Sequence, residues 1–133
     1  MTINELVGIP WIKGGYKRSG VDCWGLIILA LDELYGIKIS AHKGSKACGD
    51  EMSRLASLEA CKSEWKLVEN LTYKPGDVIL MYRKRPTHVG LYVGGGRVLH
   101  SLGGGFAKVS SIQQVDDMKI AFRKLEFYRW RSQ

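Results

Sequence analysis

The stretch D-C-W-G-L-I-I-L-A-L-D-E-L-Y-G, residues 22–36, decides the fold class of this chain. Its apolar residues recur at the i, i+3, i+4, i+7 spacing of a helix that buries one face. Asp22 is a good N-cap residue, and Gly36 suits the left-handed position after a helix end. The sequence therefore predicts a buried helix over residues 22–35, with Cys23 in its first turn. The apolar positions are Cys23, Leu26, Ile27, Ala30, Leu31 and Leu34.

Downstream of this helix the hydrophobic pattern takes on the period of strands. K-P-G-D at 74–77 is a turn signal, and short apolar runs follow at 78–82, 88–93 and 97–101. Proline and a run of three glycines separate these runs, as expected for loops between strands. A last run rich in Phe and Tyr, residues 121–130, predicts one or two more strands.

Two further segments have weaker helical patterns. Residues 50–62 carry apolar residues at helical spacing, and Ser111 with Gln114 resembles the capping box of a short helix that ends at Met118. Helices then precede a meander of strands. This order favours an α+β fold in which N-terminal helices pack on an antiparallel β-sheet.

Length and composition indicate one globular domain over residues 1–133. The longest apolar run, residues 26–31, is far shorter than the roughly 20 residues of a membrane-spanning helix. The N-terminus has no basic region followed by an apolar one, so we expect no secretory signal. The formal charge of +7 favours anionic partners, but no nucleic-acid fold signature is present and no nucleic acid is expected. We interpret the basic clusters at 83–85 and 123–131 as solvated surface.

Three cysteines are an odd count, so at least one thiol should be free and no disulfide framework is expected. Cys23 has the place of a reactive thiol, because a helix N-terminus favours the thiolate. His88 begins a predicted strand and His100 ends the next one. If these strands pair through the glycine turn, both histidines lie at the same end of the sheet. Core packing of Cys23 and a structural role for each histidine remain open alternatives.

Three ordered motifs resemble those of a known family. G-I-P-W-I-K-G-G-Y-K-R-S-G-V-D-C-W-G-L at 8–26 resembles the nucleophile motif of NlpC-type cell-wall peptidases. K-P-G-D-V-I-L-M at 74–81 and T-H-V-G-L-Y-V-G-G-G-R-V-L-H-S at 87–101 resemble the strand and histidine motifs of that family, and F-Y-R-W at 127–130 is a weaker match. D-C-W-G-L at 22–26 resembles the branch that tailed bacteriophages encode as a tail-tip component.

The resemblance implies a papain-like NlpC fold and a cysteine peptidase without metal or cofactor. It assigns Cys23 as the nucleophile, His88 as the base and His100 as the residue that orients the base. The implied reaction is hydrolysis of stem-peptide bonds in peptidoglycan, in particular the bond between D-glutamate and diaminopimelate, with a backbone amide at the helix N-terminus as oxyanion donor. Residues expected to contact the substrate are Trp11, Tyr16, Asp22 and Trp24.

Two positions depart from the motif, because Trp11 replaces the tyrosine of the family and Trp24 replaces a serine. Tryptophan has an indole N–H and no hydroxyl, and Tyr16 is an alternative source of one. The implied setting is a virion, in which the protein contacts other phage tail-tip or baseplate proteins and helps to penetrate the host wall. The alternatives are a catalytically silent structural tail-tip protein and a secreted toxin-like cell-wall amidase. A zinc site lacks the C-x-x-C or H-x-x-x-H spacing that it needs.

Overall fold

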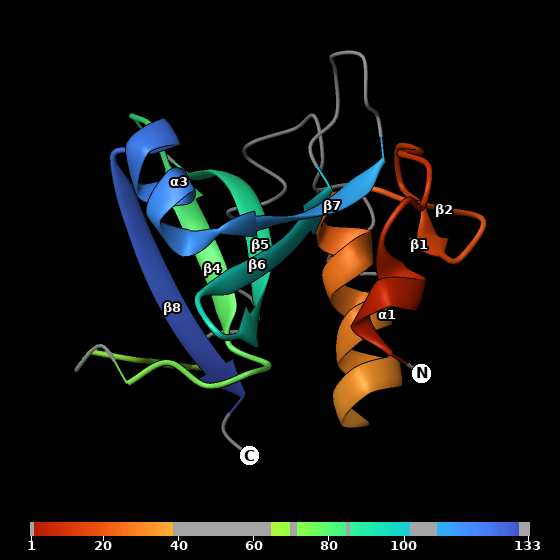
Figure 1. The fold of residues 1–133 in the computed structure, drawn as a ribbon, viewed down its shortest axis with the longest axis horizontal. Coiled ribbons are helices and arrows are strands. Elements are labelled where there is room, and N and C mark those ends of the chain that lie inside the picture. Colours follow the sequence, from red (N-terminus) through yellow and green to blue (C-terminus); the bar gives the residue numbers. More distant parts are fainter. Residues whose placement is uncertain (1, 39–64, 70–71, 85, 102–108, 131–133) are drawn as a thin grey trace.

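The computed structural model describes residues 2–38, 65–69, 72–84, 86–101 and 109–130. The chain begins with a 3-10 helix, η1 (Ile3–Leu6), followed by two short paired strands, β1 (Tyr16–Lys17) and β2 (Gly20–Val21), and then α1 (Cys23–Tyr35). This N-terminal unit lies beside an antiparallel sheet (Figure 1). The predicted α+β class is therefore confirmed.

Helix α1 forms where the sequence predicts it. The carboxylate of the N-cap Asp22 accepts the backbone N–H of Gly25 at 2.6 Å. At the other end, Gly36 has a φ of 68°, the left-handed conformation that favours glycine, and its N–H donates to the carbonyl of Asp32. The predicted helix at 50–62 lies outside the described residues.

Within the described residues the main sheet has six strands in the order β3-β8-β4-β5-β6-β7. Strands β4, β5 and β6 form the predicted meander, and β7, which we did not predict, extends it. The last strand, β8, returns to lie between β3 and β4, and β3 is a strand that we did not predict. The bounds are β3 (Trp65–Leu67), β4 (Val78–Tyr82), β5 (Pro86–Gly94), β6 (Arg97–Ser101), β7 (Ser110–Gln114) and β8 (Lys124–Trp130).

The capping-box prediction at Ser111 and Gln114 is wrong. Both residues belong to β7, and the following helix α3 (Val115–Ala121) begins only after Gln114, whose side chain makes no capping hydrogen bond. The tertiary structure overrides the local signal here, because β6 pairs along the whole of β7. The hydroxyl of Ser110 also holds this strand by accepting the N–H of Ile9 and donating to the carbonyl of Leu6.

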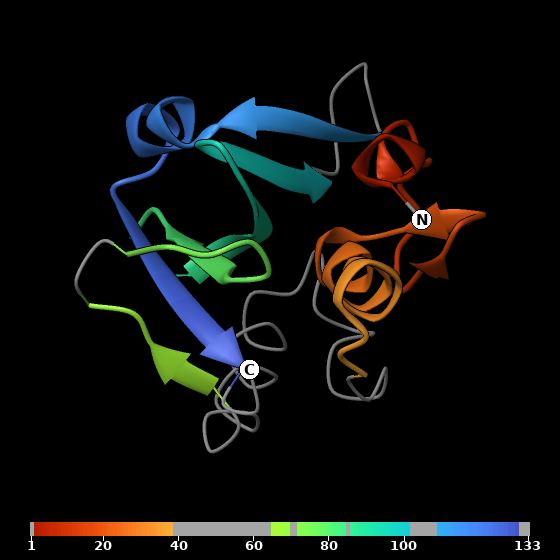
Figure 2. The ribbon, with the colours of Figure 1, turned by 60° about the horizontal axis from the view of Figure 1, so that its bottom comes forward.

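Two apolar clusters lie on opposite faces of the sheet, because successive strand residues point to opposite sides. Val78, Leu91 and Leu99 belong to the cluster that contains α1, which packs on β5 and β6. Met81 and Val98 belong to the cluster that contains α3. Figure 2 shows the two helices well apart, with the sheet curving between them. No helix among the described residues is long and apolar enough to cross a membrane.

We interpreted the basic cluster at 123–131 as solvated surface, and this interpretation is wrong for Arg129. Its guanidinium donates two hydrogen bonds of 2.8 Å to the carboxylate of Asp77, which is fully buried in the turn before β4. This bidentate pair raises the pKa of Arg129, chiefly through the hydrogen bond to Asp77. It ties β8 to the start of β4.

Candidate active site

The two histidines that the sequence singles out meet in the structure. Strands β5 and β6 pair antiparallel through the glycine turn, with Gly90 opposite His100. The Nε2 atom of His88 lies 2.9 Å from the Nδ1 atom of His100, a hydrogen-bonding distance. Both side chains are buried, with exposures of 3% for His88 and 6% for His100. The predicted proximity of the two residues is confirmed.

This contact assigns the ring nitrogens of His88. Because Nε2 faces His100, proton exchange with any other group falls to Nδ1. Burial lowers the pKa of His100 below its ordinary value of 6.5, so this ring is neutral at pH 7. When the Nδ1 of a neutral His100 accepts, the proton sits on Nε2 of His88 and Nδ1 of His88 has the lone pair. That tautomer is the one that a general base needs.

An aromatic side chain lies over His88, one ring of the histidine pair. The ring of Phe122 stacks on His88, with 6.0 Å between centroids and 18° between planes. Phe122 follows α3 directly and is itself buried. An apolar cover of this kind excludes water and strengthens the hydrogen bond beneath it. Sequence reasoning missed Phe122, because nothing in the local pattern links residue 122 to a histidine in β5.

Cys23 is the first residue of α1, as predicted, and its exposure is 1%. Figures 1 and 2 both show the first turn of α1 beside the C-terminal end of β6. That end of β6 carries His100. The fold therefore brings the start of the cysteine helix and the histidine pair to the same corner of the molecule, from opposite ends of the sequence.

Cys23 is disulfide-bonded in this structure. The odd cysteine count still leaves one of the three cysteines outside this bond. A sulfur in a disulfide is not a thiolate, and the thiolate is the nucleophile in cysteine chemistry. Any catalytic role of Cys23 therefore belongs to the reduced protein.

Asp22 holds the start of the helix in place. It is fully buried, and its two carboxylate oxygens accept the N–H of Gly25 at 2.6 Å and the N–H of Gly14 at 2.9 Å. The helix start also lies against the loop before it, because a Cβ on Gly25 would be 1.7 Å from the carbonyl oxygen of Gly15. These contacts show a structural role for Asp22, and contact with a substrate remains a prediction.

The three predicted aromatic contacts lie in different surroundings. Trp24 is buried at 3% exposure, Trp11 is half-buried, and both indole N–H groups are buried without an acceptor among the described residues. Tyr16 is 39% exposed on β1, with the ammonium of Lys17 at 5.8 Å from its ring centroid. Both indole N–H groups are therefore buried in the N-terminal unit, whereas the Tyr16 ring lies at the surface.

Residues 8–122 match the NlpC/P60 family. This matched segment covers most of the chain and includes all three candidate catalytic residues. The chain belongs to the NlpC/P60 family. Among curated relatives it is 30% identical, over 95 residues, to a probable endopeptidase of Mycobacterium tuberculosis, covering 71% of this chain and 20% of that protein. It is 26% identical, over 111 residues, to a probable endopeptidase NlpC homolog of Haemophilus influenzae, covering 84% of this chain and 51% of that protein. The chain thus spans about a fifth of the length of the first relative and about half of the length of the second.

Solved structures show the same fold. The NlpC/p60 domain of the peptidoglycan hydrolase SagA superposes with a TM-score of 0.58 at 19% identity, covering 92% of this chain and 89% of that one. RipD of Mycobacterium tuberculosis, described as a non-catalytic NlpC/p60 domain protein, superposes with a TM-score of 0.53 at 19% identity, covering 84% and 80%. The family fold thus occurs in proteins described as hydrolases and in one described as non-catalytic.

Proposed function

We propose that this chain is a cysteine peptidase that hydrolyses stem-peptide bonds of peptidoglycan. The observation that carries the proposal is the buried hydrogen bond of 2.9 Å between His88 Nε2 and His100 Nδ1. It lies at the corner where α1 begins with Cys23. Membership of the NlpC/P60 family and relatives named as probable endopeptidases support this choice of reaction.

In the proposed mechanism, His88 takes the proton of the Cys23 thiol at Nδ1. The thiolate attacks the peptide carbonyl carbon, and the negative charge moves to the carbonyl oxygen. Backbone N–H groups of the first turn of α1 stabilise this oxyanion, because the first N–H groups of a helix have no acceptor inside it. Collapse breaks the C–N bond, and His88 returns its proton to the leaving amine. A water molecule, deprotonated by His88, then attacks the thioester and releases the carboxylate and the thiol.

His100 acts through His88 in this scheme. Its buried ring holds His88 in one orientation and one tautomer, and its lowered pKa keeps it a neutral hydrogen-bond partner at pH 7. A charged His100 would oppose the positive charge that develops on His88 when it takes up the thiol proton.

The finer parts of the proposal rest on sequence motifs. We propose the bond between D-glutamate and diaminopimelate as the scissile bond, on the match of 8–26 and 87–101 to the NlpC motifs. We also propose a place in a phage tail tip, on the residues D-C-W-G-L at 22–26. Immuno-electron microscopy of assembled particles tests the second point, and antibody found only on bacterial envelopes would refute it.

Mass spectrometry of peptidoglycan fragments incubated with the purified protein tests the reaction. We expect new peptide termini in the presence of a thiol reductant, and strongly reduced cleavage without it, because Cys23 is disulfide-bonded in the structure. Cys23→Ala is the matched control and should be inactive in both conditions. Cleavage by Cys23→Ala, or intact fragments with the reduced wild-type protein, would refute the mechanism.

The second candidate is a non-catalytic wall-binding or structural protein. Two observations favour it: the disulfide at Cys23 and the fold shared with RipD, which is described as non-catalytic. It predicts that the reduced protein binds peptidoglycan and releases no new termini. The same assay therefore decides between the two candidates.

A further inference from the structure

Two basic clusters that are about forty residues apart in sequence meet at one corner of the sheet. Tyr82 at the end of β4 pairs with Lys124 at the start of β8, and the N–H of Arg123 donates to the carbonyl of Tyr82 at 2.7 Å. This pairing places the loop after β4 beside the loop after α3. We name the set the basic corner, and its members are Arg83, Lys84, Lys119, Arg123 and Lys124.

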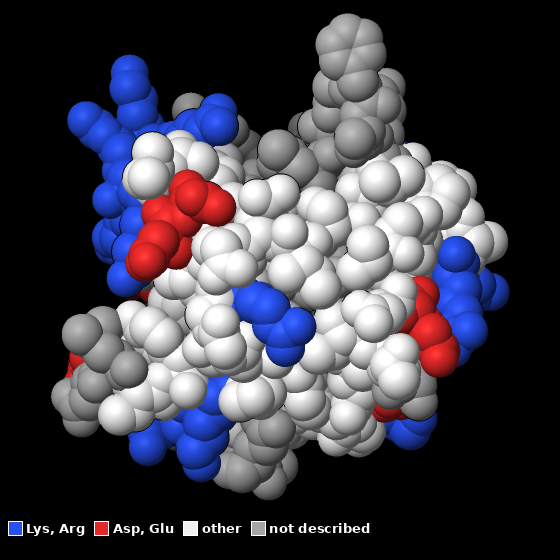
Figure 3. Space-filling model, viewed as in Figure 1, with Lys and Arg blue, Asp and Glu red and all other residues white. Residues whose placement is uncertain are grey.

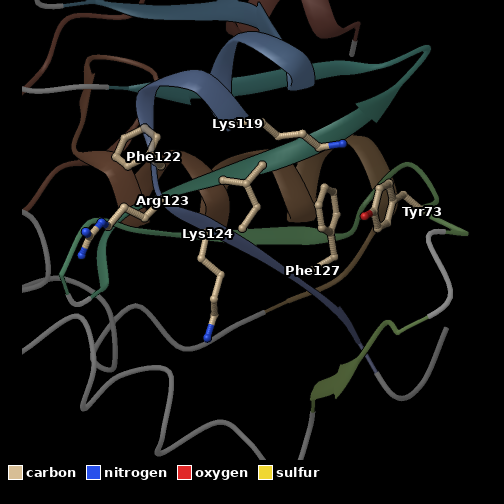
Figure 4. A pocket seen from close by; sticks show the side chains of 7 residues that line it. Tyr73, Lys119, Phe122, Arg123, Lys124 and Phe127 are labelled. Atoms are coloured by element: carbon tan, nitrogen blue, oxygen red, sulfur yellow. The ribbon is translucent and has the colours of Figure 1, made fainter.

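The basic corner has a pocket with an apolar base. Its volume is about 150 Å³, and it is lined by Lys119, Arg123, Lys124, Leu125 and three aromatic residues. In Figure 4, the rings of Tyr73 and Phe127 lie at one end and the ring of Phe122 at the other. The side chains of Lys119 and Lys124 extend from opposite sides between them (Figure 4). The rings of Tyr73 and Phe127 stack at 3.5 Å.

Most cations of the basic corner have no carboxylate of their own. Lys124 lies 3.5 Å from Glu126, whose carboxylate also accepts the hydroxyls of Tyr82 and Tyr128. Among the residues that the structure describes, the other four members form no ion pair. Figure 3 shows Lys and Arg gathered at this corner, with an acidic patch of Asp or Glu beside it on α3. The acidic residues of α3 are Asp116 and Asp117, in its first turn.

The pocket shares a wall with the histidine pair. Phe122 lines the pocket, stacks on His88 at 6.0 Å, and lies under the guanidinium of Arg83 at 5.2 Å from its centroid. A single buried ring therefore lies between the proposed base and a surface with four cations that form no ion pair with the described residues.

We propose that the basic corner binds carboxylates of peptidoglycan stem peptides, as a second contact of the polymer outside the catalytic residues. This inference rests on the proposed function, since the polymer held at the corner is the one whose peptide is cut. The stem peptides that we propose as substrate contain D-glutamate and diaminopimelate, both of which have carboxylates. Each exposed cation–carboxylate contact is weak, so several contacts on one polymer are needed for measurable binding.

Co-sedimentation with insoluble peptidoglycan tests the inference in a Cys23→Ala background, which prevents cleavage. The test variant is Lys119→Glu with Arg123→Glu, and the control is Lys38→Glu with Lys66→Glu, two exposed lysines after α1 and on β3 that change the net charge equally. We expect about tenfold weaker binding for the test variant and little change for the control. Lys119→Gln with Arg123→Gln should show an intermediate loss, and thermal denaturation by circular dichroism verifies that each variant is folded.

Three wall preparations identify the anion: untreated wall, wall freed of phosphate-bearing polymers, and the latter with its carboxylates amidated. We expect binding to survive removal of phosphate and to fall on amidation. Equal binding by the test and control variants, or binding that disappears with the phosphate, would overturn the inference. Hydrolysis by the protein that retains Cys23 is measured separately. Binding of peptidoglycan at the basic corner without any cleavage would refute only the proposed reaction. Cleavage by the protein that retains Cys23, together with normal binding by the test variant, would refute only the corner.

Discussion

At the scale of residues, the contact between the rings of His88 and His100 separates their roles. We expect His88→Ala to lose at least about a thousandfold in rate, because no other side chain in the motifs can carry the thiol proton to the leaving amine. His100→Asn keeps a hydrogen-bond partner for Nε2 of His88 and should retain a measurable rate. The rate of His100→Ala should lie between those of His100→Asn and His88→Ala. Steady-state hydrolysis of muropeptides by the reduced proteins measures this order. Equal losses in all three variants, or a His100→Ala rate below that of His88→Ala, would contradict the assignment.

Burial of His100 also predicts how stability depends on pH. Its pKa is lowered from 6.5 by desolvation, so between the lowered value and 6.5 the unfolded chain binds a proton that the folded protein does not. The free energy of unfolding should therefore fall as the pH drops below 6.5, by up to about 1.4 kcal/mol per pH unit. Urea unfolding between pH 5 and pH 8, roughly the range in which histidine titrates, measures the slope. His100→Asn should flatten it, and an unchanged slope in that variant would show that other groups are responsible.

At the scale of elements, the docking of α1 on the preceding loop explains a glycine of the nucleophile motif. A Cβ on Gly25 would lie 1.7 Å from the carbonyl oxygen of Gly15, which is backbone and has no rotamer to change. Gly25→Ala should therefore destabilise the protein by roughly 3 kcal/mol or more, and the start of α1 should shift.

The matched control is Gly36→Ala at the other end of the same helix. Gly36 has space around its Cα but a φ of 68°, so alanine should cost only about 1 kcal/mol. Chemical denaturation of both variants measures the difference. Similar losses at the two glycines would mean that the backbone conformation, and not close approach, accounts for the effect.

At the scale of the whole molecule, the last described strand, β8, lies inside the sheet. Strand β8 pairs with β3 on one side and β4 on the other, and Arg129 on β8 holds the buried carboxylate of Asp77. Arg129→Met leaves that carboxylate buried without a counter-charge and should cost about 3 kcal/mol.

A double-mutant cycle tests this pair. Asp77→Asn combined with Arg129→Met removes both charges, so the double variant should be more stable than the sum of the single losses predicts. Urea unfolding of the four proteins gives the coupling energy. Additive losses would show that the pair contributes little to holding β8 against β4.

Local chemistry was enough to predict much of this molecule. Helix α1 and both of its caps follow from apolar spacing, Asp22 and Gly36, because a helix and its ends are set by residues close in sequence. The same holds for β4, β5 and β6, which are bounded by turn residues that need special backbone angles. The pairing of His88 with His100 followed as well, since one short turn joins their strands and brings both residues to one end of the pair.

Contacts between distant segments could not be predicted. Ser111 and Gln114 looked like a helix start, yet pairing with β6 made them a strand, because a continuous ladder outweighs a single cap. Three contacts depend on the return of β8 to lie between β3 and β4. They are the stacking of Phe122 on His88, the pairing of Arg129 with Asp77 and the meeting of the two basic clusters. The sequence by itself determined helix α1, strands β4 to β6 and the candidate cysteine and histidines, through short-range propensity and motif. Only the tertiary structure decided what covers the histidines, what neutralises Asp77 and where the positive charge gathers, since burial and charge depend on neighbours that sequence distance does not reveal.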